Sequence, residues 1–262
     1  IGKAFRNEII ARNFIFRTRE FEQMEMQYFV HPSEDESSME LWKEKRINFY
    51  TEELGISKNN LKFHQHLEDA LAHYAKDAFD IEYNFPFGWG EIEGIHNRTN
   101  FDLKEHERLS GKNMMYFDAI KNEKYHPFII ETSTGLNRLF LMVLCESYYE
   151  DNKNNRIVLK LPFDLAPNKI VICPLLKKDG LPERAKEIFD SINSIHKCVY
   201  DQQGSIGKRY YRQDEAGTPF GITIDHKTLE NNTITIRERD SMEQHRIPVD
   251  NILKFISQNK II

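Results

Sequence analysis

The chain has 262 residues, 40% of them hydrophobic, with 36 Lys and Arg against 41 Asp and Glu and a formal net charge of -5. This length and apolar content are enough for one large domain or two ordinary ones, and the absence of an 18-residue apolar run or a signal-peptide pattern predicts a soluble cytoplasmic protein without membrane contacts. Its three cysteines, odd in number and widely spaced, argue against a disulfide framework or a zinc site.

Residues 1 to about 30 are expected to form a strand hairpin that reverses around residues 11–13. Side chains two apart in a strand project to the same side, which would place several arginines, an aromatic ring and carboxylates along one pocket. The guanidinium fork matches phosphate oxygens, a phenyl ring can cover a purine, and a carboxylate accepts hydrogen bonds from an amine. An amphipathic hairpin with exposed ion pairs is the alternative for any single pair. The complete spacing favours a nucleoside triphosphate site built from Arg6, Glu8, Arg17, Phe21 and Glu25.

Apolar residues at three- and four-residue spacing predict helices at 39–54 and 61–79. The second helix would direct His64 and His66 to different sides, which disfavours a metal site. Residues 85–95 are then expected to form a strand entering the site.

On the strand predicted at 85–95, Glu91 and Glu93 are expected to lie on the face opposite Ile92. An ordinary half-buried strand with solvated carboxylates is the alternative.

A short buried strand at 128–131 is predicted to lead into a helix at 133–149. Arg138 would lie in the first turn of this helix, where the helix dipole and free N–H groups favour anions. A surface arginine on an amphipathic helix is the alternative. The strand and the Ser-x-Gly turn before it favour a phosphate-binding role.

A polar stretch and two prolines place the domain boundary between about 151 and 168. Strands and helices then alternate, which predicts an α/β layer with a mostly parallel sheet and an antiparallel edge. The expected strands cover 169–176, 198–201, 220–225 and 233–239, and the expected helices cover 182–195, 206–216 and 249–258.

The segment 204–212 interleaves cations with aromatic residues, a combination suited to phosphates and to stacking on unpaired bases. Residues 1–167 carry the acidic excess and residues 168–262 a slight basic excess, so any nucleic-acid contact would depend on a local patch. A solvated helix with a basic face is the alternative. Arg237, Arg239 and Arg246 could complete the same surface.

Two motifs carry a resemblance to a known family. Phe5-Arg6-Asn7-Glu8 with Arg17, Phe21 and Glu25 resembles motif 2 of the class II aminoacyl-tRNA synthetases, and the segment 131–138, Glu-Thr-Ser-Thr-Gly-Leu-Asn-Arg, resembles motif 3. Further similarity to the glycyl-tRNA synthetase family runs in order through residues 72–75, 85–95, 97–99 and 101–103, and extends to the C terminus.

The resemblance implies an α/β protein with two domains. An α+β catalytic domain with an antiparallel sheet would cover residues 1–155, followed by a smaller α/β anticodon-binding domain with a mixed sheet at 168–262. The implied activity is glycine--tRNA ligation, with ATP and Mg²⁺ as cofactors, tRNA(Gly) and glycine as partners, and a homodimer for the full-length enzyme. Motif 1 is missing, so we expect a C-terminal fragment whose own activity and dimerisation are compromised.

The same resemblance implies roles for individual residues. ATP would contact Arg6, Asn7, Glu8, Arg17, Thr18, Phe21, Glu91, Ile92 and Arg138, with Arg6, Arg17 and Arg138 catalytic and Glu91 the metal ligand. Glycine would contact Glu25, Glu131, Thr132 and Ser133; many relatives carry proline where this chain has Thr132. The tRNA would contact Lys208, Arg209, Tyr210 and Arg212.

Two other functions remain open at this stage. One is a non-catalytic relative that binds nucleic acid or a polymerase, against which the retained arginines argue. The other is an enzyme that adenylates a different small acid without RNA transfer, against which the C-terminal domain argues.

Overall fold

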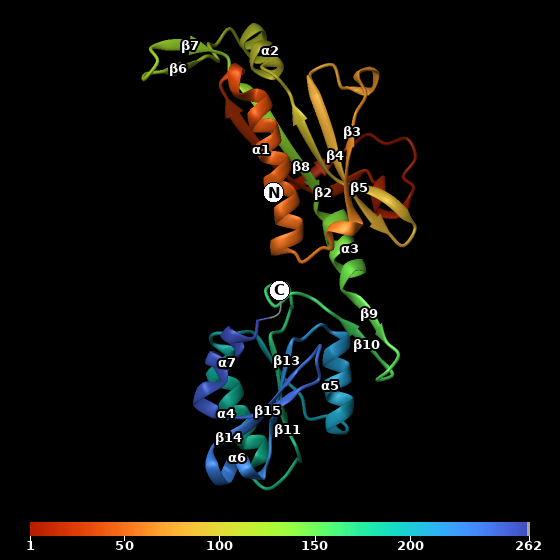
Figure 1. Cartoon of the computed structure of the whole chain (residues 1–262), viewed down its shortest axis with the longest axis vertical. Coiled ribbons are helices and arrows are strands. Elements are labelled where there is room, and N and C mark those ends of the chain that lie inside the picture. The colour runs from red at the N-terminus through yellow and green to blue at the C-terminus, as the bar shows by residue number, and fades with distance from the viewer. Residues whose placement is uncertain (261–262) are drawn as a thin grey trace. The chain divides into compact units, whose positions relative to one another are not determined.

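The computed structural model describes residues 1–260 and divides into two compact units, residues 1–145 and 146–262 (Figure 1). Within the described residues, no helix is both long and apolar enough to cross a membrane. The three cysteines form no disulfide, as their spacing predicted.

The first unit is built on a six-stranded sheet of order β1-β2-β8-β5-β4-β3, in which every neighbouring pair is antiparallel, as expected for the catalytic domain. Its strands are β1 (Gly2–Phe5), β2 (Glu20–Val30), β3 (Leu61–Gln65), β4 (Asp77–Phe85), β5 (Gly88–Asn97) and β8 (Phe128–Gly135). The other elements are α1 (Asp35–Asn48), α2 (Phe101–Ser110), the hairpin β6 (Tyr116–Asp118) and β7 (Glu123–Tyr125), and the start of α3 (Leu136–Ser147).

Helix α1 and the π turn Phe49–Glu53 after it lie against one face of this sheet and close its core. The side chains of Tyr50, Ile81, Ile95, Ile130 and Met142 are fully buried there. The opposite face carries the polar residues of the candidate site. Short 3-10 turns occur at Phe14–Phe16, Pro32–Glu34, Lys58–Asn60 and Glu68–Ala70.

The helix predicted at 61–79 is wrong. Residues 61–65 form β3, which pairs with β4 in the register Leu61↔Tyr83 to Gln65↔Phe79. The apolar residues that suggested a helix lie in the turn and loop between these strands. Strand pairing at the sheet edge outweighed a local periodicity that was weak evidence by itself. Within β3 and just after it, His64 and His66 contact Glu82 and Asp80.

Glu91 lies on the face opposite Ile92, as predicted, but the face predicted for Glu93 is wrong, because β5 contains a β-bulge. Ile81 pairs with Glu93 but Glu82 pairs with Glu91, so Ile92 is an extra residue in the strand. As a result, Ile92 and Glu93 are both buried, while Glu91 lies half-exposed on the other face. The Glu93 carboxylate accepts hydrogen bonds of 2.6 Å from Arg46 Nε and from Tyr50 Oη.

The second unit has a mixed five-stranded sheet of order β12-β11-β13-β14-β15, with parallel β12, β11 and β13 and antiparallel β14 and β15. The strands are β11 (Ile170–Pro174), β12 (Cys198–Tyr200), β13 (Phe220–Ile224), β14 (Thr233–Glu238) and β15 (Gln244–Pro248). The helices are α4 (Leu181–Asn193), α5 (Ile206–Glu215), α6 (His226–Asn231) and α7 (Ile252–Gln258), with a 3-10 turn at Val249–Asn251. The prediction lacked α6 and β15.

The hairpin of β9 (Tyr148–Asp151) and β10 (Arg156–Leu159) groups with the second unit, although the predicted first domain extended to residue 155. Its Arg156 is buried and contacts Asp214 of α5 at 2.7 Å. Arg237 of β14 contacts the same carboxylate at 2.9 Å. This buried network ties the hairpin to α5 and the sheet.

Candidate active site

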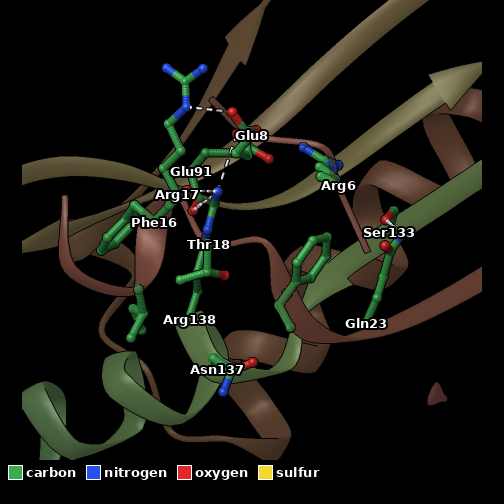
Figure 2. A pocket seen from close by; sticks show the side chains of 13 residues that line it. Arg6, Glu8, Phe16, Arg17, Thr18, Gln23, Glu91, Ser133, Asn137 and Arg138 are labelled. Carbon is green, nitrogen blue, oxygen red and sulfur yellow. Dashed lines mark hydrogen bonds and ion pairs between the residues drawn. The ribbon is translucent and has the colours of Figure 1, made fainter. Parts of the chain in front are cut away.

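One cavity of the first unit brings together three arginines that are remote in the sequence (Figure 2). Arg6 follows β1, Arg17 lies in the loop before β2, and Arg138 lies in the first turn of α3. The antiparallel pairing of β1, β2 and β8 holds these segments side by side. The full lining comprises Arg6, Glu8, Ile15, Phe16, Arg17, Thr18, Phe21, Gln23, Glu91, Ser133, Gly135, Asn137 and Arg138.

Arg138 is held in place by contacts with two other segments. Its Nη1 donates to the Glu91 carbonyl at 2.8 Å and lies 3.3 Å from the Glu91 carboxylate, while its Nη2 donates to the Phe16 carbonyl at 2.9 Å. Its guanidinium also lies 5.0 Å from the centre of the Phe16 ring. The helix dipole adds positive potential at this position.

Arg6 and Arg17 come from an ordered loop between β1 and β2. The Arg6 guanidinium carbon lies 5.2 Å from the centre of the Phe21 ring, and Arg17 Nε contacts the Glu8 carboxylate at 2.7 Å. Arg19 braces the loop by donating to two of its carbonyls at 2.8 and 3.0 Å. The reversal occurs at residues 13 and 14, which adopt positive φ of 58° and 51°.

The predicted strand spacing from Arg17 to Glu25 is therefore wrong at its start, because β2 begins only at Glu20. Arg17 reaches the cavity from the loop, and Glu25 lies on β2 outside the cavity lining. Two other predicted ATP contacts are absent from the lining formed by residues 1–260. Asn7 is exposed, and the bulge turns Ile92 into the core, where it is 1% exposed.

A polar face adjoins the cavity on β2, β8 and β5. The register pairs Glu25 with Ser133 and Gln27 with Glu131, and opposed residues of antiparallel strands project from the same face. Sequence reasoning missed the two glutamines that link this face. Gln23 Nε2 donates to Ser133 Oγ at 2.5 Å and to Glu25 at 2.9 Å, and Gln27 Nε2 donates to Glu25 at 3.0 Å and to Glu131 at 3.2 Å.

Glu131 lies at the end of this face, where Arg98 supports it at 3.2 Å. Burial alone would raise the pKa of the Glu131 carboxyl, but the neighbouring His96 and Arg98 side chains outweigh it and the pKa is lowered. The lowered pKa keeps the Glu131 carboxylate ionised at neutral pH.

Thr132 does not join this face. Its side chain alternates to the core side of β8 and is 5% exposed, so its predicted glycine contact is wrong for the side chain.

The predicted tRNA surface on α5 is only partly exposed. Arg209 is 3% exposed and donates to the carbonyls of Pro174 and Gly204, and Tyr210 is 8% exposed and hydrogen-bonded to Thr223. Both face the sheet because α5 packs its apolar and hydrogen-bonding side against β11 and β13. Lys208 remains exposed, and Arg212 is half-exposed and pairs with Asp201.

The three arginines expected to complete that surface do not form it. Arg237 and Arg239 are 4% and 1% exposed, and each is paired with an aspartate inside the unit. Arg246 is partly exposed and pairs with Asp225. A strand bearing several arginines indicated a basic surface, but their carboxylate partners could not be identified without the fold.

Residues 169–259 match the family model of the anticodon binding domain. The chain is also similar to curated proteins named glycine--tRNA ligase. It is 52% identical to that of Borrelia hermsii over 98% of the chain and 59% of the relative, and 54% identical to that of Treponema denticola over 98% and 58%. It is 47% identical to that of Corynebacterium glutamicum over 100% and 59%. The chain thus spans less than two thirds of the length of these relatives.

These matches agree with the motifs, the antiparallel sheet of the first unit and the mixed sheet of the second. The chain is therefore similar to the glycine--tRNA ligases over almost its whole length, and residues 169–259 of its second unit match the anticodon binding domain.

Proposed function

We propose that this chain carries the ATP and glycine sites of a glycine--tRNA ligase. The reaction joins glycine and ATP into glycyl-adenylate with release of pyrophosphate, then transfers the glycyl group to the 3′ end of tRNA(Gly). One observation carries the proposal: Arg6, Arg17 and Arg138 line one cavity together with the Phe21 ring, next to a face of carboxylates.

The first step needs charge neutralisation and alignment more than a general base. The glycine carboxylate is already ionised at neutral pH when it attacks the α-phosphate. Arg6, beside Phe21, is suited to the α-phosphate while the ring covers the adenine, and Arg17 and Arg138 are suited to the terminal phosphates. Arginines held in place before the reaction stabilise the developing charge without reorganisation.

Two carboxylates in the cavity are paired with these arginines. Glu8 contacts Arg17 and Glu91 contacts Arg138. Phosphate oxygens would compete for the same guanidinium groups, which would release Glu8 toward the adenine edge and Glu91 toward a cation.

Glu91 together with the phosphate oxygens of ATP would hold Mg²⁺, because this ion is commonly held by one or two carboxylates plus substrate phosphates. The described residues contain no group of three metal-ligating side chains that would bind it alone. The ion would neutralise charge on the phosphates when bound.

The glycine ammonium fits the face formed by Glu25, Glu131 and Ser133, whose carboxylates are already oriented by Gln23 and Gln27. The tRNA would reach the second unit through the exposed Lys208 and Arg212. We place the enzyme in the cytoplasm and expect a homodimer for the full-length ligase.

The test is glycine-dependent exchange of pyrophosphate into ATP. It is measured on this chain and on a chimera in which the chain replaces the matching part of the Treponema denticola ligase. Exchange in the chimera supports the proposal. A chimera that folds but shows no exchange would favour a non-catalytic binding protein. Exchange with another small acid in place of glycine would favour a different adenylating enzyme.

A further inference from the structure

The polar face beside the cavity ends at an imidazole for which the proposed reaction has no assigned role. His96 on β5 is paired in register with Glu131 of β8, and Gly94 is paired with Ser133. Both therefore project on the same face as the residues proposed to hold the glycine ammonium. The side chain of His96 is 24% exposed, so part of the ring is accessible to solvent.

Gly94 makes a depression in this face, and the ring of His96 leans over it. A Cβ placed on Gly94 would lie 3.0 Å from Cε1 and 3.3 Å from Nε2 of His96, and 3.6 Å from the Asp80 carboxylate. The imidazole and the carboxylate thus occupy the volume that a side chain at this position would need.

Neighbouring charges restrict the ring. Nδ1 of His96 is buried without a hydrogen-bond partner and lies 3.7 Å from the Glu131 carboxylate. Glu131 is fixed by Arg98, which in turn contacts Asp102 at 2.8 Å and lies 4.0 Å from the centre of the Tyr74 ring. On the other side, Asp80 is held by His66 at 2.8 Å. The ring therefore lies between two anchored carboxylates.

This placement matters for a substrate without a side chain. One extra methyl changes binding by only about 10- to 200-fold when a pocket discriminates by contact alone, so exclusion of alanine requires that the space be filled. A glycine held by its ammonium group at Glu25, Glu131 and Ser133 would have its α-carbon near Gly94, which is paired with Ser133, and the imidazole would close the remaining space there.

We propose that His96, seated over Gly94, is the wall that excludes amino acids larger than glycine. The inference rests on the glycine site proposed on the polar face beside the cavity. His96 acts here as a specificity-determining residue and takes no part in the transfer of protons or phosphate.

The test compares two probes that differ by one methyl group, the non-hydrolysable sulfamoyl analogues of glycyl-adenylate and alanyl-adenylate. Isothermal titration with the 262-residue chain measures both affinities. In the His96→Ala variant, the affinity for the alanyl analogue is expected to rise, and the preference for the glycyl analogue is expected to fall by about tenfold. A gain in affinity cannot result from misfolding.

His64→Ala is the matched control, because His64 lies on the edge strand β3, separated from β5 by β4, and its side chain is 57% exposed. It should keep the preference of the unaltered chain. If the unaltered chain prefers the glycyl analogue and His96→Ala keeps that preference, His96 is not the wall and the proposed function stands. If the unaltered chain binds neither analogue, the proposed function and the inference both fail.

Discussion

Replacement of Arg138 by alanine tests whether the arginine cavity binds the phosphates of ATP. The guanidinium can offer charge-assisted hydrogen bonds to phosphate, and loss of such bonds costs about 1.5 to 3 kcal/mol. Since about 1.4 kcal/mol is a factor of ten, the dissociation constant for ATP should rise by roughly 10- to 150-fold. Arg138→Lys keeps the charge but not the planar fork, so its loss of ATP affinity should be smaller than that of Arg138→Ala.

Arg138 also supports the loop through the carbonyl of Phe16, so the experiment must separate loop support from phosphate binding. Arg19→Ala is the matched control, because Arg19 donates to two loop carbonyls but does not line the cavity. Isothermal titration with ATP at two salt concentrations measures both variants, and the difference should shrink at high salt because the contact is ionic. Equal ATP affinity in Arg138→Ala and Arg19→Ala would refute the assignment.

Three further outcomes are expected. Phe21→Ala should weaken ATP binding by about 1 to 3 kcal/mol, the usual cost of losing the stacking between a base and an aromatic side chain. Binding of tripolyphosphate, which has no base, should weaken less. Equal losses for the two ligands in competition titrations would contradict stacking. Asp214→Ala leaves Arg156 and Arg237 buried without their shared carboxylate, which should cost about 3 to 5 kcal/mol in urea denaturation; an effect no larger than that of the exposed Asp250→Ala would contradict this. Hydrogen bonds from Asn154 and then Arg156 lower the pKa of Asp151 from 3.8 to about 2. The stability that Asp151 adds is thus present above about pH 4 and lost as the pH falls toward 2, and Asp151→Asn should flatten that part of a urea-denaturation series; an unchanged slope would exclude Asp151 as its source.

Some of this architecture could be predicted from the sequence alone. The alternation of apolar runs and helical stripes after residue 168 predicted most strands and helices of the second unit, because these elements follow their local hydrophobic period, whereas α6 and β15 were missed. The strand predicted at 128–131 and the helix predicted at 133–149 also formed, but β8 continues to Gly135 and α3, which bears Arg138 in its first turn, begins only at Leu136. The motif residues predict a triphosphate site because their chemistry is specific, and binding of ATP there stays a prediction.

Other features depended on contacts between distant segments. Whether Glu93 faces the cavity or the core was decided by a bulge set by the pairing of β5 with β4, and no local pattern marks a bulge. Likewise, the sequence around Arg209 and Tyr210 indicates an exposed basic and aromatic surface. Both side chains are buried because α5 packs them against its sheet.

The sequence by itself thus determined which chemical groups are available and, where hydrophobic periods are strong, which segments become helices and strands. Only the tertiary structure decided which arginines share a cavity, which carboxylates already have partners, and which side chains are buried. The physical reason is that secondary structure follows from neighbours a few residues apart, whereas burial and ion pairing depend on strand register and on side chains that can lie more than a hundred residues away, as for Gln27 and Glu131.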